Sequence, residues 1–474
     1  MVVGEIVIET DVVVIGGGPG GYAAAIRLGQ LGKSVVLIEK DQLGGVCLHH
    51  GCIPSKTLIH SAEQFHNLPQ LEKMGIHIPA EQALFQMEAW QNWKNNIISQ
   101  LNQGITHLCI ENDVTIVKGT ATFLSEDRIR VETSNDAETY RFENAIIATG
   151  SRPFIPSFIQ MDGTYILDST AALQMQSIPS SLAIIGGGYI GIELGMAFAK
   201  LGTRVTIIEM ANRILPNISK HLTQEVMFTA KKLGITFETA TKVEKVAIEN
   251  NQVHLRVFSE LQQSKILISD RALVTIGRIP NTDSIGLEQA GIQTDEHQYI
   301  TVDEQCRTNI PHIFAIGDIT PGPALAHKAA KQGKVAAEVI GGLPSAMDST
   351  LVPYVIFSNP QIAGVGLTRE EAEQQGFSIK TGTFPFRANG RAVATNETQG
   401  FAEVIVDAET HLLLGMHIVG NDASNLIGEG VLALELAARV EDIALTIHPH
   451  PTLAEGWLEA AEAALGHAIH IVQK

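Results

Sequence analysis

Residues 11–39 read DVVVIGGGPGGYAAAIRLGQLGKSVVLIE, and this stretch decides the fold. Its pattern predicts an apolar strand (12–15), a glycine turn, a helix from about Tyr22 to Leu31 and a second apolar strand (35–38). A strand, a helix and a parallel strand in this order form a βαβ unit. We therefore expect a parallel sheet that is covered by helices.

The turn within this stretch has GxGxxG spacing, made by Gly16, Gly18 and Gly21. The first glycine allows a tight turn, the second lets a pyrophosphate approach the backbone, and the third lets the helix pack closely. The amino terminus of the helix adds free amides and a positive dipole, which favour phosphate. Glu39 lies 23 residues after Gly16, where its carboxylate can accept hydrogen bonds from both ribose hydroxyls.

A second copy of this pattern lies in residues 182–209. It predicts a strand (182–185), a helix (192–201) and a strand (205–208), and its acid, Glu209, lies 23 residues after the first glycine of the turn. The glycines of this second turn are Gly186, Gly188 and Gly191. A single GxGxxG match can be an ordinary glycine turn, but two complete units in one chain predict two dinucleotide sites.

The surroundings of the two units indicate which dinucleotide each one binds. A pair of cysteines follows the first unit, which suits a tightly held redox-active ring, whereas no thiol lies near the second unit. We therefore expect FAD at the first unit and an exchanging NAD at the second. Glu209 would repel the 2′-phosphate of NADP, and residues 210–212 offer no cation to hold it. Arg213 leaves this preference open.

The cysteine pair, Cys47 and Cys52, lies in the segment GGVCLHHGCIPSK (44–56). The two sulfurs can meet, and a disulfide that closes so small a loop adds little stability through chain entropy, which favours a redox role. Pro54 is expected to prevent a regular helix from beginning before it. A helix amino terminus or a cationic neighbour would lower the thiol pKa. The nearby candidates are His49, His50 and Lys56. The alternative is a pair of ordinary reduced cysteines in a glycine-rich loop.

The composition excludes several classes of protein. The 474 residues suffice for about three domains, and 45% hydrophobic with 18% charged residues is typical of a globular chain. The net charge of -18 and the lack of a dense cationic cluster make nucleic acid a poor partner. No apolar run long enough to span a membrane and no leader pattern are found, so we expect a cytoplasmic location. Four cysteines are too few for a secreted disulfide framework, and Cys109 and Cys306 are expected to be core residues.

Taken together, these motifs resemble the pyridine nucleotide-disulfide oxidoreductase family, and within it the dihydrolipoyl dehydrogenase branch. The resemblance runs through nearly the whole chain. Its further motifs are ATGS (148–151), GGGYIGIELG (186–195), TIGRIPNT (275–282), IFAIGDI (313–319), ALAHKA (324–329) and HPHPTLAEG (448–456). The resemblance implies an FAD-containing enzyme that moves electrons from a dithiol, through the cysteine pair and the flavin, to NAD.

The resemblance also implies roles for the residues of the thiol chemistry. Cys47 is similar to the interchange thiol that meets the substrate, and Cys52 to the charge-transfer thiol beside the flavin. His450 matches the acid-base residue, and Glu455 the carboxylate that orients it. An imidazole held by a carboxylate can take a thiol proton near neutral pH.

Other residues resemble the family's cofactor contacts. Lys56 and Glu193 match a pair near the reactive edge of the flavin, although a solvated lysine is the ordinary alternative. Asp318 is similar to the residue that contacts the ribityl chain. Ala326 and His327 lie in the segment that packs along the flavin, where His327 is nearly as well explained as a packing residue. Further cofactor contacts are expected at Gly119, Gly150 and Gly277, and no metal ligand is expected.

The architecture implied by the resemblance is α/β, with two Rossmann-like dinucleotide-binding domains and an α+β carboxyl-terminal dimerisation domain. The FAD domain would comprise 1–149 and 279–348, the NAD domain 150–278 and the interface domain 349–474. His450 would then serve the disulfide of the opposite subunit, which implies an obligate homodimer. The implied partners are a lipoyl domain and the acyltransferase core of a 2-oxo acid dehydrogenase complex, with the lipoyl group supplied by a separate protein.

Three alternative functions make different predictions for the same residues. A mercuric reductase would be expected to add cysteines near the carboxyl terminus, yet the last cysteine is Cys306. A glutathione reductase would be expected to have basic residues around Glu209. A docking subunit without catalysis would not need an intact cysteine pair with His450 and Glu455. One departure from many relatives is His49 and His50, which replace a small polar and an aliphatic residue and leave the thiol environment open.

Overall fold

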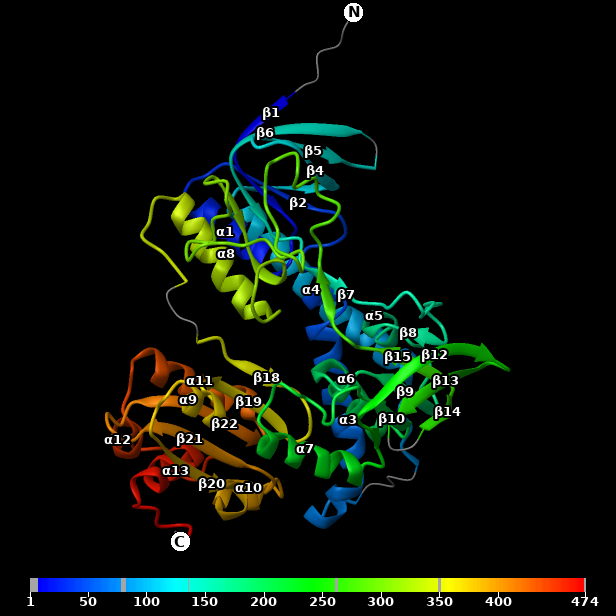
Figure 1. The fold of residues 1–474 in the computed structure, drawn as a ribbon, viewed down its shortest axis with the longest axis vertical. Helices are drawn as coiled ribbons and strands as arrows, with labels where there is room; N and C mark the ends of the chain where they lie inside the picture. The colour runs from blue at the N-terminus through cyan, green and yellow to red at the C-terminus, as the bar shows by residue number, and fades with distance from the viewer. Residues whose placement is uncertain (1–6, 78–81, 135, 261–262, 348–350, 473–474) are drawn as a thin grey trace, which may run out of the picture.

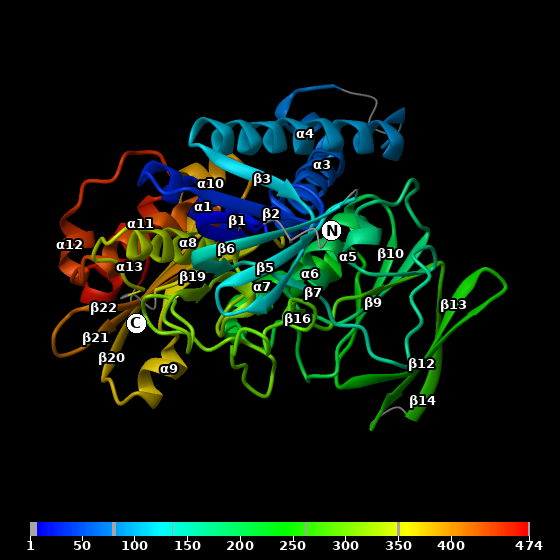
Figure 2. The same ribbon diagram turned by 90° about the horizontal axis from the view of Figure 1, so that it is seen from above.

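The computed structural model describes residues 7–77, 82–134, 136–260, 263–347 and 351–472. Three units, each built on its own main sheet, make up the fold (Figure 1). The long helix α3 (Cys52–Leu71) runs from the first unit to the second (Figure 1), and α4 (Met87–Glu111) lies beside it (Figure 2). Within the described ranges, no helix is both long enough and apolar enough to cross a lipid bilayer.

The first unit is built on the predicted βαβ stretch. Strand β1 (Val7–Ile15) pairs in parallel with β2 (Val35–Glu39) on one side and β6 (Ala137–Ile147) on the other. Because both faces of this strand are covered, its run of valines is fully buried. Helix α1 (Pro19–Gln30) packs against α8 (Ala326–Ile340), which comes much later in the chain. The sheet also contains β3 (Val114–Lys118), β4 (Thr120–Ser125), β5 (Arg128–Glu132) and β17 (Ile313–Ala315).

The second unit repeats this arrangement. Its sheet has the order β11-β10-β9-β15-β8, and helix α6 (Tyr189–Lys200) connects β9 (Ser181–Ile185) to β10 (Arg204–Ile208). The other strands of this sheet are β8 (Ile166–Leu167), β11 (Thr236–Glu238) and β15 (Arg271–Val274). A three-stranded antiparallel sheet consists of β12 (Thr241–Glu249), β13 (Gln252–Ser259) and β14 (Gln263–Ser269). Two further helices are α5 (Ser169–Ala172) and α7 (Lys220–Lys232).

The third unit is an antiparallel sheet with helices packed on it. The strand order is β18-β19-β22-β21-β20. These strands are β18 (Tyr354–Ile356), β19 (Gln361–Gly366), β20 (Ile379–Pro385), β21 (Phe401–Asp407) and β22 (Leu413–Gly420). The helices are α9 (Arg369–Gln374), α10 (Gly390–Ala394), α11 (Ala423–Glu435), α12 (Val440–Leu445) and α13 (Glu455–Leu465). The expected α/β class with an α+β carboxyl-terminal part is confirmed.

The chain crosses between the first two units at a short ribbon. Strand β7 (Ser151–Pro153) pairs antiparallel with β16 (Arg278–Pro280), and each lies next to an expected domain boundary. After the second crossing the chain returns to the first unit, where β17 pairs with β6. The domain boundaries 1–149 with 279–348, 150–278 and 349–474 themselves stay predictions.

Both glycine turns lead into their helices earlier than the sequence pattern predicted. Helix α1 begins at Pro19 rather than near Tyr22, and α6 begins at Tyr189 rather than near Ile192. In both cases the residue before the helix is the second glycine of the turn, which has extended backbone geometry. The pattern missed these first turns because they contain glycines, Gly20 and Gly21 in α1 and Gly191 in α6, which are buried but carry no side chain that would mark an apolar helix face.

Candidate active site

The glycines of the first turn each meet a different steric demand. Gly16 has a φ of 103°, a left-handed conformation that strains other residues. A Cβ on Gly21 would lie 1.8 Å from the carbonyl oxygen of Gly16, so this position needs a glycine for the helix to pack against the turn. A Cβ on Gly18 would meet no protein atom within 4 Å. The backbone at Gly18 is therefore open to a ligand, as a pyrophosphate site requires.

The second turn reproduces this geometry. Gly186 has a φ of 110°, and a Cβ on Gly191 would lie 2.2 Å from the Gly186 oxygen. Gly188 again faces open space. The two turns are therefore equivalent cradles, and each fits the phosphate end of a dinucleotide.

The acid at the end of each second strand is fixed by two backbone amides. Glu39 accepts a hydrogen bond from the amide of Gly17 at 2.7 Å and from that of Asp41 at 2.8 Å. Glu209 accepts from Gly187 and Ala211, both at 2.7 Å. Because a carboxylate oxygen has two lone pairs, each acid can still accept hydrogen bonds from a ribose.

Arg213, which left the choice between NAD and NADP open, is tied to the backbone of its own loop. Its guanidinium donates to the carbonyl oxygen of Ile218 at 2.5 Å and to that of Pro216. These bonds use two of the five N–H donors of the guanidinium and hold it against the backbone of residues 216–218. NAD stays the expected coenzyme because of Glu209.

A cavity of about 550 Å³ connects the first glycine turn to the cysteine pair. Its lining includes most of the residues expected at the flavin. These are Gly16, Gly18, Glu39, Cys47, Cys52, Lys56, Gly119, Gly150, Glu193, Asp318 and Ala326. The glycine cradle at one end and the sulfurs at the other fit an elongated dinucleotide with a redox-active ring, such as FAD. His327 is not part of this lining, and its ring bonds to the carbonyl oxygen of Pro353 at 2.7 Å, as expected for a packing residue.

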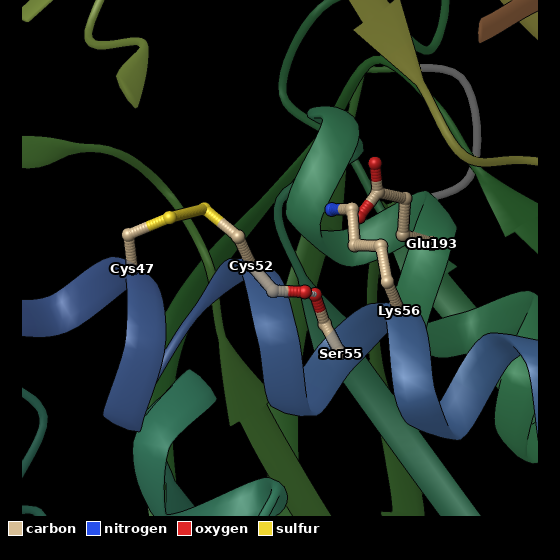
Figure 3. Close-up of a disulfide and its surroundings, with 5 residues drawn as sticks. All are labelled: Cys47, Cys52, Ser55, Lys56 and Glu193. Atoms are coloured by element: carbon tan, nitrogen blue, oxygen red, sulfur yellow. Dashed lines mark hydrogen bonds and ion pairs between the residues drawn. A yellow bond between two sulfur atoms is a disulfide. The ribbon is translucent and has the colours of Figure 1, made fainter. Parts of the chain in front are cut away.

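Cys47 and Cys52 form a disulfide within this cavity (Figure 3). Cys47 lies in the short helix α2 (Gly45–His49), Cys52 is the first residue of α3, and their Cα atoms are 4.7 Å apart. The expectation that Pro54 would prevent a helix from beginning before it is wrong. The first turn of a helix has no intrahelical acceptors for its amides, so proline fits there without losing a hydrogen bond. Cys52 consequently sits at the positive end of a long helix, which stabilises a thiolate.

Lys56 and Glu193 meet beside the disulfide. Lys56 Nζ lies 2.7 Å from Glu193 Oε2, and the two side chains project toward each other from α3 and α6 (Figure 3). The side chain of Glu193 is only 4% exposed and that of Lys56 is 31% exposed. The other oxygen of Glu193 accepts a hydrogen bond from the amide of Phe357 at 2.9 Å. The ammonium group of Lys56 therefore has a fixed position in the wall of the cavity.

Two residues that the sequence did not single out organise Asp318. The hydroxyl of Ser151 donates to Asp318 at 2.5 Å, and Arg278 donates to that hydroxyl at 2.7 Å and to the carbonyl of Ser151 at 2.6 Å. Both residues belong to motifs that were recognised, ATGS and TIGRIPNT, but the β7–β16 pairing that brings them together spans more than a hundred residues. Gly277, also expected at a cofactor, has a φ of 138° and open space beside it but does not line the cavity.

The two unusual histidines near the disulfide have local partners. His49 bonds through Nε2 to the carbonyl oxygen of Leu43 at 2.8 Å. Nε2 of His50 lies 3.7 Å from a carboxylate oxygen of Asp41. Both histidines line the cavity, so either could influence the thiols. Cys109 and Cys306 are free and buried, as expected of core residues, and burial raises their pKa values to about 11 and about 12.

His450 and Glu455 form a dyad outside the cavity. His450 Nδ1 lies 2.8 Å from Glu455 Oε1, and the amide of Thr452 donates to Glu455 Oε2 at 2.8 Å. Burial raises the pKa of Glu455, but the hydrogen bonds from Thr452 and His450 outweigh it and lower this pKa overall. The carboxylate therefore remains ionised and fixes the imidazole. The His450 side chain is 75% exposed, and neither residue lines the cavity of its own chain.

Comparisons with known proteins agree with this geometry. A family profile described as "Pyridine nucleotide-disulphide oxidoreductase" matches residues 10–333, and the corresponding "dimerisation domain" profile matches residues 352–461. Dihydrolipoyl dehydrogenase of Geobacillus stearothermophilus is 48% identical over 476 residues, and that of Bacillus subtilis is 46% identical over 475 residues. In both comparisons the match covers 100% of each chain.

Solved structures match the fold as well. LpdA from Mycobacterium tuberculosis superposes with a TM-score of 0.90 at 26% identity, over 96% of this chain and 99% of that one. The HOCl-induced flavoprotein disulfide reductase RclA from Escherichia coli gives a TM-score of 0.84 at 29% identity, over 95% and 99%.

Proposed function

Because the chain belongs to the pyridine nucleotide-disulphide oxidoreductase family, and within it to the dihydrolipoyl dehydrogenases, we propose that its Cys47–Cys52 disulfide takes electrons from a dihydrolipoyl group. Enzymes of this kind use FAD and NAD. The observation that carries the proposal is that the disulfide, the Lys56–Glu193 pair and the first glycine turn line one and the same cavity.

In the proposed reaction, one thiol of the dihydrolipoyl group attacks Sγ of Cys47, and the disulfide breaks to leave Cys52 as a thiolate. The second thiol of the substrate then displaces Cys47, so that the substrate leaves as a cyclic disulfide. The substrate loses two electrons and the cysteine pair gains them. His450, held by Glu455, accepts the proton of the attacking thiol. When bound, FAD and NAD supply the acceptors for this electron pair.

The remaining residues of the cavity position the cofactors in this proposal. The glycine turn at Gly16 and Gly18 with Glu39 holds the adenosine diphosphate part of FAD, with further contacts at Gly21, Gly119 and Gly150. Lys56, fixed by Glu193, stabilises negative charge on the ring, and Asp318 and Ala326 lie along its length. NAD occupies the second turn, where the proposed contacts are Gly186, Gly188, Gly191, Glu209 and Gly277.

Replacing Cys52 tests the proposal. The Cys52→Ser variant should lose dihydrolipoamide-dependent reduction of NAD while it still binds FAD, because serine cannot form the disulfide. The matched control is Cys109→Ala, which removes a buried thiol that lies outside the cavity. If Cys52→Ser turned over dihydrolipoamide at the rate of the control, the proposal would be wrong.

We also propose that the enzyme is a homodimer in which His450 of one subunit serves the disulfide of the other. Two observations support this arrangement: the His450–Glu455 dyad lies outside the cavity of its own chain, and the third unit carries several exposed apolar side chains. These are Leu432, Leu436, Leu445 and Ile447. Sedimentation and a test of complementation between Cys52→Ser and His450→Gln chains would check it, since a mixed dimer regains one complete site.

The proposed partners are a lipoyl domain and the acyltransferase core of a 2-oxo acid dehydrogenase complex, and the proposed location is the cytoplasm. Reduction of the flavin by an isolated dihydrolipoyl domain would test the first partner directly. Cell fractionation tests the location.

A further inference from the structure

Two ion pairs join α3 to α6, and both connect residues at the same offset along the two helices. The inner pair is Lys56 with Glu193, and the outer pair is Glu63 with Lys200. In both pairs the partners are separated by 137 residues. On each helix the two members are seven residues apart, which is about two turns, so they share one face. The signs alternate: α3 presents a lysine and then a glutamate, and α6 presents a glutamate and then a lysine.

In both pairs the side chain on α6 is more deeply buried than its partner on α3. On α6 the side chains of Glu193 and Lys200 are each 4% exposed, whereas on α3 those of Lys56 and Glu63 are 31% and 28% exposed. A buried charge is costly without a partner. Each charge on α6 therefore depends on one residue of α3, and the two helices can satisfy both charges only in this register.

A segment of the third unit closes both pairs from a third side. The amide of Phe357 donates to the free oxygen of Glu193, and the side-chain amide of Asn359 lies 3.1 Å from both carboxylate oxygens of Glu63. All three units of the fold therefore meet at these two glutamates. The inner pair lines the cavity, but neither Glu63, Lys200 nor Asn359 does.

We infer that the outer pair, with Asn359, is a positioning device that sets the register of α3 against α6 and so holds Lys56 in place beside the flavin. The inference rests on the proposed role of Lys56. The inference has a direct structural basis. Helix α3 begins at Cys52, and α6 begins at Tyr189, directly after the second glycine of the NAD turn. A slip between these helices moves the disulfide and Lys56 relative to the NAD turn, and reaction rates are sensitive to displacements of this kind.

The test uses holoenzyme variants of the outer pair. Glu63→Gln keeps the shape of the side chain but leaves Lys200 buried without a counter-charge, and Lys200→Arg keeps the charge. Two properties of the reduced enzyme are measured anaerobically. The first is the long-wavelength charge-transfer band between the Cys52 thiolate and the flavin, and the second is the rate at which NAD reoxidises the enzyme. For Glu63→Gln we expect a weakened or shifted band and reoxidation about tenfold slower. The Lys200→Arg variant should keep most of the wild-type band and reoxidation rate. The charge swap, Glu63→Lys combined with Lys200→Glu, should restore most of what Glu63→Gln loses.

Asp127→Asn is the matched control, because it removes a carboxylate that lies in the turn between β4 and β5, outside both helices, and forms an exposed ion pair with Arg141. The inference is overturned if Glu63→Gln shows the band and reoxidation rate of this control and only unfolds at a lower denaturant concentration, since the outer pair would then serve stability alone. Should Glu63→Gln not fold, Asn359→Ala provides the same comparison, because it keeps both charges and releases only the hold on Glu63. A wild-type enzyme without a thiolate band would instead contradict the proposed function.

Discussion

Replacing Glu455 by glutamine should separate the thiol half of the reaction from the rest. The substitution keeps the size of the side chain but removes the negative charge 2.8 Å from His450 Nδ1. With the dielectric constant of water, which suits the 75% exposure of the His450 side chain in one chain alone, the lost attraction to the imidazolium that forms during proton transfer is about 1.5 kcal/mol, and contact with the partner in the proposed dimer would increase it. That energy corresponds to about tenfold in rate. Loss of the fixed ring orientation adds to it, so we expect dihydrolipoamide turnover to fall by roughly 10- to 100-fold.

The assay compares two activities of the same preparation. Dihydrolipoamide-dependent reduction of NAD needs the thiol chemistry, whereas reduction of a dye by NADH reaches the flavin without it. Glu455→Gln should slow the first reaction and leave the second near the wild-type rate. Equal loss of both activities, or an unchanged rate with dihydrolipoamide, would refute the role of the dyad.

Three further predictions concern the glycine turn, the coenzyme and pH. Gly18→Ala should leave the stability of the apoprotein unchanged but weaken FAD binding, because its Cβ meets only open space, whereas Gly21→Ala should cost about 1–3 kcal/mol or more in denaturant unfolding. Glu209→Ala should raise the kcat/KM for NADP relative to NAD, because it removes the charge that repels a 2′-phosphate. The hydrogen bond to Glu429 raises the pKa of His448, so this contribution to stability is complete below about pH 6.5 and is lost as the pH rises through the raised pKa. Unfolding measurements should therefore find that Glu429→Gln destabilises the protein more at pH 6 than at pH 9, and an equal effect at both would contradict the assignment.

Local patterns predicted the features that short-range physics determines. The sequence predicted the two glycine turns, their flanking strands and the terminal acids Glu39 and Glu209. In each unit the signals, glycine spacing and short apolar runs, all lie within about thirty residues of each other. The same reasoning misplaced the beginnings of α1 and α6, because the glycines of their first turns, Gly20, Gly21 and Gly191, are buried but carry no apolar side chain. It also misjudged Pro54, because proline breaks helices only beyond the first turn.

Contacts between distant segments could not be derived from the sequence alone. Lys56 and Glu193 were matched through the family resemblance, but no local signal marks Glu63 as the partner of Lys200, since their pairing depends on how α3 and α6 pack. For the same reason, the link from Arg278 through Ser151 to Asp318 became visible only when β7 and β16 were seen to pair. Such long-range groups follow from packing geometry, which composition and periodicity do not encode.

The central claim, that a reversible Cys47–Cys52 bond exchanges electrons with a flavin in the same cavity, is tested most directly by a visible spectrum. The purified, FAD-loaded protein is titrated anaerobically with dihydrolipoamide and then with NAD. We predict a yellow protein that develops a long-wavelength thiolate–flavin band after the first reducing equivalent and loses it when NAD is added. A protein that stays colourless after reconstitution with FAD, or a flavin that never develops this band, would contradict the account.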